Sequence, residues 1–164
     1  MILFDYLDDD VTDYFIEKLK YFTSDEKFYY HAKTMIGDYF GTTNLLLEGD
    51  EEFLVCMDKV KEKAEKVLSL SLQHVHVHML DYTKGGEMAM HNHAHAEMWT
   101  SILYLNDAAG DTFFYIDDKK QYVSPSKGKL VCYPSHLDHG SNYSTTKKVL
   151  VSGYMDICIA NIHK

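Results

Sequence analysis

Three histidines and a glutamate alternate with small residues in the stretch His91-Asn92-His93-Ala94-His95-Ala96-Glu97. Alternate side chains of an extended strand point to one face, so all four groups could share a face. Imidazole and carboxylate groups are ligands that iron, zinc and manganese accept. Alternate residues lie about 6.5–7 Å apart along a strand, which lets two or three of these side chains converge on one ion. All four can converge only if the chain turns here.

A second group of metal-type ligands lies downstream, in Pro134-Ser135-His136-Leu137-Asp138-His139-Gly140. His139 follows a predicted strand and precedes a glycine, where the chain can bring an imidazole inward. A His-x-His pair on one strand and a remote histidine on another would cap one face of a metal and leave its other positions open. His136 and Asp138 are competing candidates, because a surface loop also favours these residue types.

The composition limits the class of protein and its partners. The chain has 164 residues, so we expect one domain over 1–164. A net charge of -9 argues against nucleic acid or an anionic membrane surface as the main partner. The sequence contains no arginine, so a bound anion must meet lysine, hydroxyl groups or backbone amides. Cys56, Cys132 and Cys158 form no CxxC motif, and no stretch has transmembrane length; we expect a soluble cytoplasmic protein without a disulfide framework.

Residues 1–70 are predicted to form a helical support. Acidic residues Asp8 to Asp10 precede an apolar stripe that continues to Phe22, and residues 50–68 carry apolar side chains at helical spacing. The aromatic-rich segment 28–36 is ambiguous between strand and helix, and 37–44 is expected to be a turn.

Residues 71–164 are predicted to form the β-rich core, because the periodicity changes to two after residue 70. Within 70–80, His74, His76 and His78 alternate with apolar residues, which indicates a polar strand face or a second metal site. Further strands are expected at 100–105, 112–116, 130–133 and 149–156, with turn signals at 84–86, 106–110, 117–120, 125–128 and 142–146. Many short strands without intervening helices predict a barrel or jelly roll.

The second half of the chain resembles a known family at several motifs. Its specific segments are Tyr104-Leu105-Asn106, the run Gly110 to Phe114, and the approach from Pro125 to Ser135 that leads to His139. These are similar to the Fe(II)- and 2-oxoglutarate-dependent oxygenases of the prolyl-hydroxylase-like branch. The resemblance implies a double-stranded β-helix, a jelly-roll core backed by the N-terminal helices.

The resemblance also implies roles for individual residues. His91 matches the first metal ligand and His139 the distal one. Tyr104 matches the tyrosine that binds the far carboxylate of 2-oxoglutarate, Lys148 the basic residue that pairs with it, and Tyr82 a tyrosine that lines the cosubstrate pocket. Fe(II), 2-oxoglutarate and molecular oxygen would be the reactants beside a small-molecule or peptide substrate.

One position departs from the family pattern. Where the family has His-x-Asp or His-x-Glu, this sequence has His91-x-His93. We expect His93 to be the third ligand; Glu97, reached by a bend, or the frame His95-x-Glu97 are the alternatives. Trp99 and His76, with the strand face that His76 shares, are candidates for the substrate wall.

The same departure favours a rival family. Gly85, His91-x-His93 and Glu97 resemble the first motif of the cupins, which share the jelly-roll core and bind metal through three histidines and a glutamate. Tyr104 stands where that motif would close on a glycine, and the Gly110 to Phe114 segment has no cupin counterpart. A cupin-type dioxygenase or isomerase and a non-enzymatic metal-binding jelly roll therefore remain as alternatives to the oxygenase.

Overall fold

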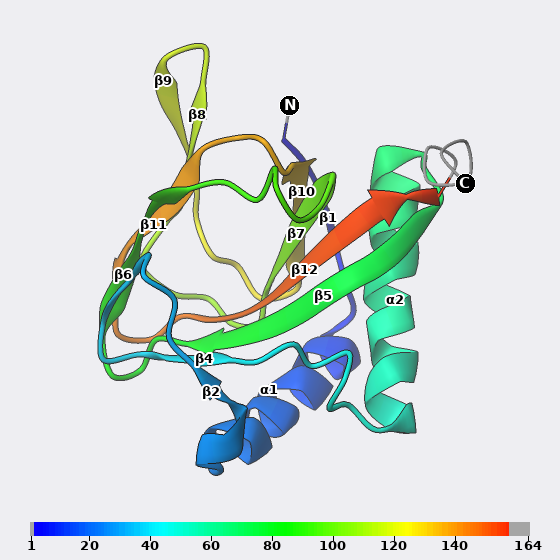
Figure 1. Cartoon of the computed structure of the whole chain (residues 1–164), viewed down its shortest axis with the longest axis vertical. Coiled ribbons are helices and arrows are strands. Elements are labelled where there is room, and N and C mark those ends of the chain that lie inside the picture. Colours follow the sequence, from blue (N-terminus) through cyan, green and yellow to red (C-terminus); the bar gives the residue numbers. More distant parts are fainter. Residues whose placement is uncertain (1, 158–164) are drawn as a thin grey trace.

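Figure 1 shows a computed structural model of the chain, which describes residues 2–157. The N-terminal part contributes two α-helices, a short 3-10 helix and four short strands. In chain order these are β1 (Leu3–Tyr6), α1 (Asp9–Thr23), η1 (Glu26–Phe28), β2 (Tyr29–Tyr30), β3 (Met35–Gly37), β4 (Phe40–Thr42) and α2 (Glu51–Leu68). Segment 1–70 therefore supplies strands to both sheets as well as the expected helices, and β4 lies within the predicted turn at 37–44.

The remaining chain is almost entirely strand. It forms β5 (Leu72–Asp81), β6 (Gly86–His91), β7 (Trp99–Tyr104), β8 (Thr112–Ile116), β9 (Lys119–Val123), β10 (Lys129–Pro134), β11 (His139–Ser144) and β12 (Lys148–Asp156). All pairings are antiparallel. One sheet has seven strands in the order β1-β10-β7-β12-β5-β4-β2, and the other has five in the order β3-β6-β11-β8-β9. The fold is a jelly-roll core backed by helices, as the sequence predicted.

Alternation along the strands creates two apolar cores. On β7, Leu103 packs with the helices, whereas Ile102 and Tyr104 pack in the core between the sheets. The seven-stranded sheet therefore buries both of its faces, one under α1 and α2 and one against the five-stranded sheet (Figure 1). Among the described residues, no helix has the length and apolar character needed to cross a membrane.

The helices follow from local signals that the sequence shows. The side chain of Asp50 caps α2 by accepting a hydrogen bond from the Phe53 amide at 2.9 Å, and acidic residues occupy the first turn of both helices. Phe15 of α1 and Phe53 of α2 are fully buried, and their rings meet edge to face at 5.7 Å. The two helices are thus fixed to each other as well as to the sheet.

Two strands extend into segments that were predicted to be turns. β11 runs to Ser144 through part of the predicted turn at 142–146, and β9 begins at Lys119 within the predicted turn at 117–120. The tight turn of the β8–β9 hairpin is made by Asp117 and Asp118, which both have positive φ. The thiols of Cys56 and Cys132 are free, and Cys158 lies outside the described residues.

Candidate functional site

The pairing of β6 with β11 brings two of the predicted ligands together. His139 lies directly opposite His91 in the antiparallel register, so both side chains project from the same face of the sheet. Their ring centroids are 4.4 Å apart. The two histidines come from positions 48 residues apart in the sequence, and strand pairing alone makes them neighbours.

His93 reaches the same point from a loop. β6 ends at His91, and the chain turns at residues 94–96 before β7 begins. The amide of His93 donates a hydrogen bond to the Ser135 carbonyl at 2.8 Å, which fixes the start of this loop against the end of β10. The His93 ring lies 4.9 Å from that of His91 and 5.1 Å from that of His139.

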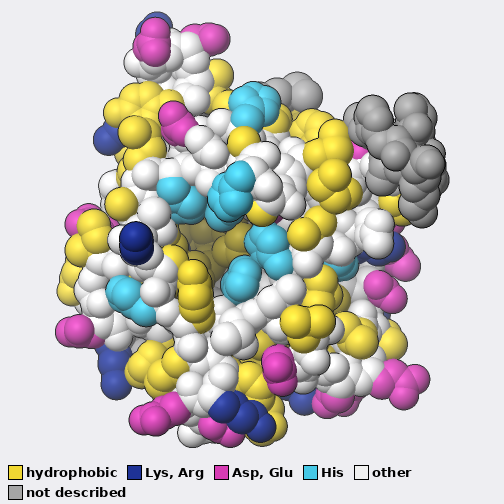
Figure 2. Space-filling model, viewed as in Figure 1, with side chains coloured by type: hydrophobic (Ala, Val, Ile, Leu, Met, Phe, Trp, Pro, Cys, Tyr) yellow, Lys and Arg dark blue, Asp and Glu magenta, His cyan; other side chains and the backbone are white. Residues whose placement is uncertain are grey.

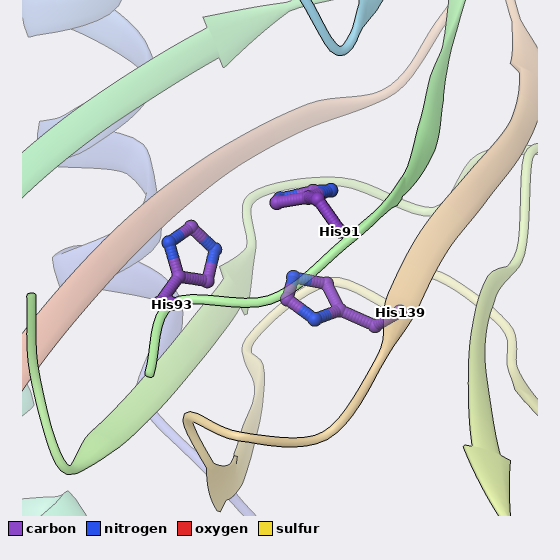
Figure 3. Close-up of side chains that lie close together, drawn as sticks. All are labelled: His91, His93 and His139. Atoms are coloured by element: carbon purple, nitrogen blue, oxygen red, sulfur yellow. The ribbon is translucent and has the colours of Figure 1, made fainter. Parts of the chain in front are cut away.

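Figure 3 shows the three imidazoles turned toward one another. Each can offer a ring nitrogen, and these nitrogens lie within 4.8 Å of one another, close enough to bind one ion. The turn after His93 carries His95 out of this group: His95 is exposed and belongs to neither ligand group among the described residues. The geometry therefore brings together His91, His93 and His139, the set the sequence analysis preferred.

Hydrogen bonds set two of the rings for coordination through Nε2. Nδ1 of His91 lies 2.8 Å from the Ala89 carbonyl oxygen, and Nδ1 of His139 lies 3.0 Å from that of Leu137. Since a carbonyl oxygen only accepts, both Nδ1 atoms carry the proton and both Nε2 atoms present a lone pair. Nε2 of His139 is 3.2 Å from the Tyr133 hydroxyl, which is the donor in that contact.

The environment keeps these histidines neutral. Burial lowers the pKa of His91 below its ordinary value, and it lowers the pKa of His93 to about 3 and of His139 to about 4. The neighbouring imidazoles lower the last two further, because a second positive charge beside the first is unfavourable. Neutral imidazole is the form that binds metal, so the donor set fits a divalent ion of the iron or zinc type.

A second group shares His93 with the first. Glu97 has a fully buried side chain, its Oε1 contacts His76 Nε2 closely, and the same oxygen lies 3.6 Å from Nδ1 of His93. Oε2 accepts a hydrogen bond from the Thr100 hydroxyl at 3.1 Å. Glu97 is thus buried behind His93 and does not belong to the group of three histidines.

The three histidines open onto a cavity of about 570 Å³ between the two sheets. In Figure 2, histidine side chains surround a hollow with an apolar floor. The apolar lining includes Met35, Leu80, Met88, Ile102, Val149 and Val151. Two lysines and six histidines line the cavity, and none of its lining residues is Asp or Glu. The charged residues of the lining are therefore positive, whereas the chain as a whole carries a net charge of -9.

The buried cation of the cavity is Lys147, whereas the family resemblance implied Lys148 in this place. Lys147 is 2 % exposed, and its ammonium donates to the Gly110 carbonyl at 2.8 Å and lies 4.3 Å from the centre of the Tyr82 ring. Lys148 does not line the cavity. The reason is strand alternation: Lys147 shares its face with the cavity-lining Val149 and Val151. That alternation was visible in the sequence and could have identified Lys147.

Of the two tyrosines implied by the family resemblance, Tyr82 contacts this lysine and Tyr104 lies behind the cavity lining. Tyr82 lines the cavity, stacks on Tyr39 with 4.2 Å between ring centroids, and has its hydroxyl 3.4 Å from the Ser141 hydroxyl. Tyr104 is fully buried, and its hydroxyl lies 2.5 Å from that of Thr112, which does line the cavity. The hydroxyls of Ser141 and Thr112 are polar cavity groups that the sequence analysis did not single out.

The two substrate-wall candidates separate in the structure. His76 lines the cavity, but Trp99 does not: it is half-buried and packs against the helix-side core. Trp99 shares a face of β7 with Leu103, which belongs to that core. Alternation on the strand therefore turns the indole away from the metal ligands.

A β-bulge divides the three histidines of β5. In the pairing with β12, His76 is opposite Gly153 and His74 is opposite Tyr154, so Val75 has no partner. The extra residue reverses the alternation: His76 lines the cavity together with His78, whereas the ring of His74 packs at a tilt against Tyr154 of the helix-side core, with 4.9 Å between the ring centroids. The expectation of three histidines on one strand face therefore fails at the bulge.

No protein-family model matches the sequence, and no curated protein matches it. Solved structures do match in fold. A prolyl-4-hydroxylase from Pseudomonas putida is 18% identical with a TM-score of 0.69, covering 93% of this chain and 90% of its own. A Trichoplax adhaerens prolyl hydroxylase, solved with a peptide fragment of hypoxia inducible factor, is 13% identical with a TM-score of 0.74, covering 100% and 86%.

A third similar structure is the epimerase SnoN from nogalamycin biosynthesis, solved with Fe3+, alpha ketoglutarate and nogalamycin RO. It is 14% identical with a TM-score of 0.72, and the match covers 94% of this chain and 78% of SnoN. The expected likeness to the Fe(II)- and 2-oxoglutarate-dependent oxygenases is thereby confirmed for the fold.

Replacing His139 by Ala should abolish stoichiometric binding of Co(II), because two imidazoles would remain of a three-nitrogen site. His95→Ala is the matched control, since this exposed histidine lies in the same loop as His93 but in neither ligand group. Titration of the metal-free protein, followed through the visible absorption of Co(II), measures both variants. One equivalent of Co(II) retained by His139→Ala would show that the ligands lie elsewhere.

Proposed function

We propose that this chain is an Fe(II)- and 2-oxoglutarate-dependent oxygenase that hydroxylates a small molecule or a peptide side chain. The observation that supports this most is the combination inside one cavity of three neutral imidazoles with a buried lysine. The lysine ammonium and a divalent metal would provide two positive charges for a dicarboxylate, and none of the described residues that line the cavity is acidic. The jelly-roll fold shared with hydroxylases and with SnoN supports the same reading.

In this proposal His91, His93 and His139 would hold the iron, and Lys147 would provide the cation for the far carboxylate of 2-oxoglutarate. The Lys147 ammonium, together with the hydroxyls of the cavity-lining residues Ser141 and Thr112, would donate hydrogen bonds to that carboxylate. The iron would supply the oxygen chemistry, which converts substrate, 2-oxoglutarate and O2 to hydroxylated product, succinate and carbon dioxide.

The chain's own residues orient the reactants and exclude water. Backbone carbonyls fix the tautomers of two metal ligands, and the aliphatic side chains of Ile102, Val149 and Val151 line the cavity. 2-Oxoglutarate is a small dicarboxylate and would fill only part of about 570 Å³. The remaining volume would admit a small molecule or one side chain of a peptide.

A cupin-type dioxygenase is the second candidate, and one observation favours it. The ligand group contains a third histidine where the prolyl-hydroxylase-like family has a carboxylate, and a buried glutamate, Glu97, lies beside it. A site of three histidines and one glutamate would need no 2-oxoglutarate. The two candidates therefore differ in whether the cavity binds this cosubstrate.

Anaerobic titration of the Fe(II)-loaded protein with 2-oxoglutarate tests the proposal. Chelation of the metal by the keto acid should produce a weak visible charge-transfer band that saturates at one equivalent. Glutarate, which has both carboxylates but no keto group, is the control and should produce no band. Absence of 2-oxoglutarate binding at millimolar concentration would remove the oxygenase from consideration and leave the cupin-type candidate.

Lys147→Ala should weaken 2-oxoglutarate binding by at least about 100-fold, because removing one partner of a buried charge pair typically costs about 3–5 kcal/mol. Lys148→Ala removes the same charge from the adjacent residue, which does not line the cavity, and should change the affinity little. Isothermal titration of the metal-loaded variants measures the difference. Equal losses in both variants, or a loss only in Lys148→Ala, would contradict this placement of the cosubstrate.

Binding of 2-oxoglutarate should also weaken at alkaline pH. Burial lowers the pKa of Lys147 to about 8, although nearby Asp111 acts in the opposite direction. Below pH 8 the lysine of the free protein is protonated and can pair with the carboxylate. Above pH 8 the lysine must take up a proton when 2-oxoglutarate binds, so the dissociation constant should rise about tenfold per pH unit. Lys147→Arg keeps its charge and should show a flat profile over pH 7–9.5, whereas a wild-type profile equally flat would contradict the prediction.

A further inference from the structure

Glu97 is held in a site that the surrounding strands build for it. Its side chain is fully buried, and contacts come from His76 on β5 and Thr100 on β7. Thr100 in turn shares a hydrogen bond of 2.8 Å with Ser135. A carboxylate without exposure is costly unless it is paired and hydrogen-bonded, and here both oxygens have partners.

Gly153 of β12 leaves the space that this carboxylate occupies. A Cβ added at Gly153 would come within 2.0 Å of Glu97 Oε2 and 2.6 Å of His76 Nε2. Backbone conformation does not require glycine here, since φ of Gly153 is not positive. The close approach of the glutamate and the histidine is therefore what excludes a side chain at this position.

The three candidate ligands differ in what faces their Nδ1 atoms. A neutral backbone carbonyl faces that atom in His91 and in His139, whereas in His93 it is the Glu97 carboxylate, 3.6 Å away. A carboxylate behind a metal-bound imidazole fixes the ring orientation and makes the opposite nitrogen a stronger donor. It also contributes negative charge near a centre whose three neutral ligands contribute none.

We propose that Glu97 acts through His93 as a positioning residue: its carboxylate faces Nδ1 of His93 at 3.6 Å, without a hydrogen bond in this structure, and by its charge favours the ring orientation that turns Nε2 to the metal. Glu97 thus places near the metal the negative charge that an Asp or Glu ligand at position 93 would have supplied and that the neutral imidazole of His93 does not. Its pairing with His76 and Thr100 keeps it out of the coordination sphere. This inference rests on the proposed metal site, but it does not depend on 2-oxoglutarate.

Competition between the protein and a chelator for Co(II) tests the role of Glu97. Glu97→Gln keeps the shape and loses the charge, and its affinity for Co(II) should fall about 10- to 100-fold while one ion still binds. The Fe(III)/Fe(II) midpoint potential of the iron-loaded variant should rise, because the oxidised metal loses more stabilisation than the reduced one. A merely structural role would leave that potential unchanged. Neither measurement needs the cosubstrate, so failure here is distinguishable from failure of the oxygenase proposal.

Asp138→Asn is the matched control. It removes one negative charge near the ligands, but Asp138 is exposed and bonds Asn92 at 3.0 Å instead of a ligand ring. Because solvent screens this exposed charge, the variant should change the affinity and the potential much less than Glu97→Gln does. Gly153→Ala is the second test, because it retains Glu97 chemically but displaces it; if Glu97→Gln does not fold, this variant should show the same loss of affinity.

Three results would overturn the proposal. Wild-type affinity and potential in Glu97→Gln would leave the carboxylate with a structural role only. A loss as complete as that of His93→Ala would make Glu97 a direct ligand. Binding of two Co(II) ions per chain, with the second lost in His76→Ala, would make His76, His93 and Glu97 a separate metal site.

Discussion

The candidate site depends on one register. Because His139 is paired with His91 across β6 and β11, two imidazoles project side by side from the same face of the five-stranded sheet. The third ligand can then come from a short loop, since β6 ends at His91 and only Asn92 separates it from His93. A slip of one residue in this pairing would turn one imidazole to the opposite face of the sheet. The arrangement of the ligands therefore depends on the β6–β11 register.

Charge is arranged in layers around this centre. The chain as a whole is acidic, the cavity lining contains cations and neutral histidines, and the nearest buried carboxylate lies behind a ligand. A dianion can therefore enter a cavity where it meets no like charge, although the outer surface repels it at long range. The absence of arginine makes this arrangement depend on lysine, whose protonation burial can change; a guanidinium would stay charged.

Much of the fold was readable because the signals were local. Helical spacing and acidic first turns predicted α1 and α2, and alternation with turn residues predicted β5, β7, β8, β10 and β12. β11 was missed because its face toward the other sheet carries His139 and Ser141 instead of a hydrophobic pattern, and β9 was missed because it is mostly exposed and polar. A strand that buries few apolar side chains shows no alternation of apolar and polar residues, so its sequence does not indicate a strand.

The sequence prediction agrees with the structure where residue spacing determines the geometry, and it went wrong where the face of a strand decides which side chain enters the cavity. The three histidines could be chosen from sequence, but Lys147 and Lys148 are adjacent and differ only in which face of β12 they occupy. Trp99 is aromatic and close to the ligands in sequence, yet it lies on the helix side of β7. The pairing of Glu97 with His76 joins residues from a loop and a distant strand, and no local pattern indicates such a contact.

The bulge at Val75 has a consequence for how this cavity can change over evolution. One unpaired residue separates the part of β5 whose Leu72 and His74 face the helices from the part whose His76 and His78 face the cavity. A descendant that lost this residue would have to rotate one of the two parts, either burying imidazoles under the helices or exposing apolar side chains to the ligand. A deletion of one codon could thus change every side chain that β5 contributes to the cavity lining, whereas a single substitution in β5 changes one.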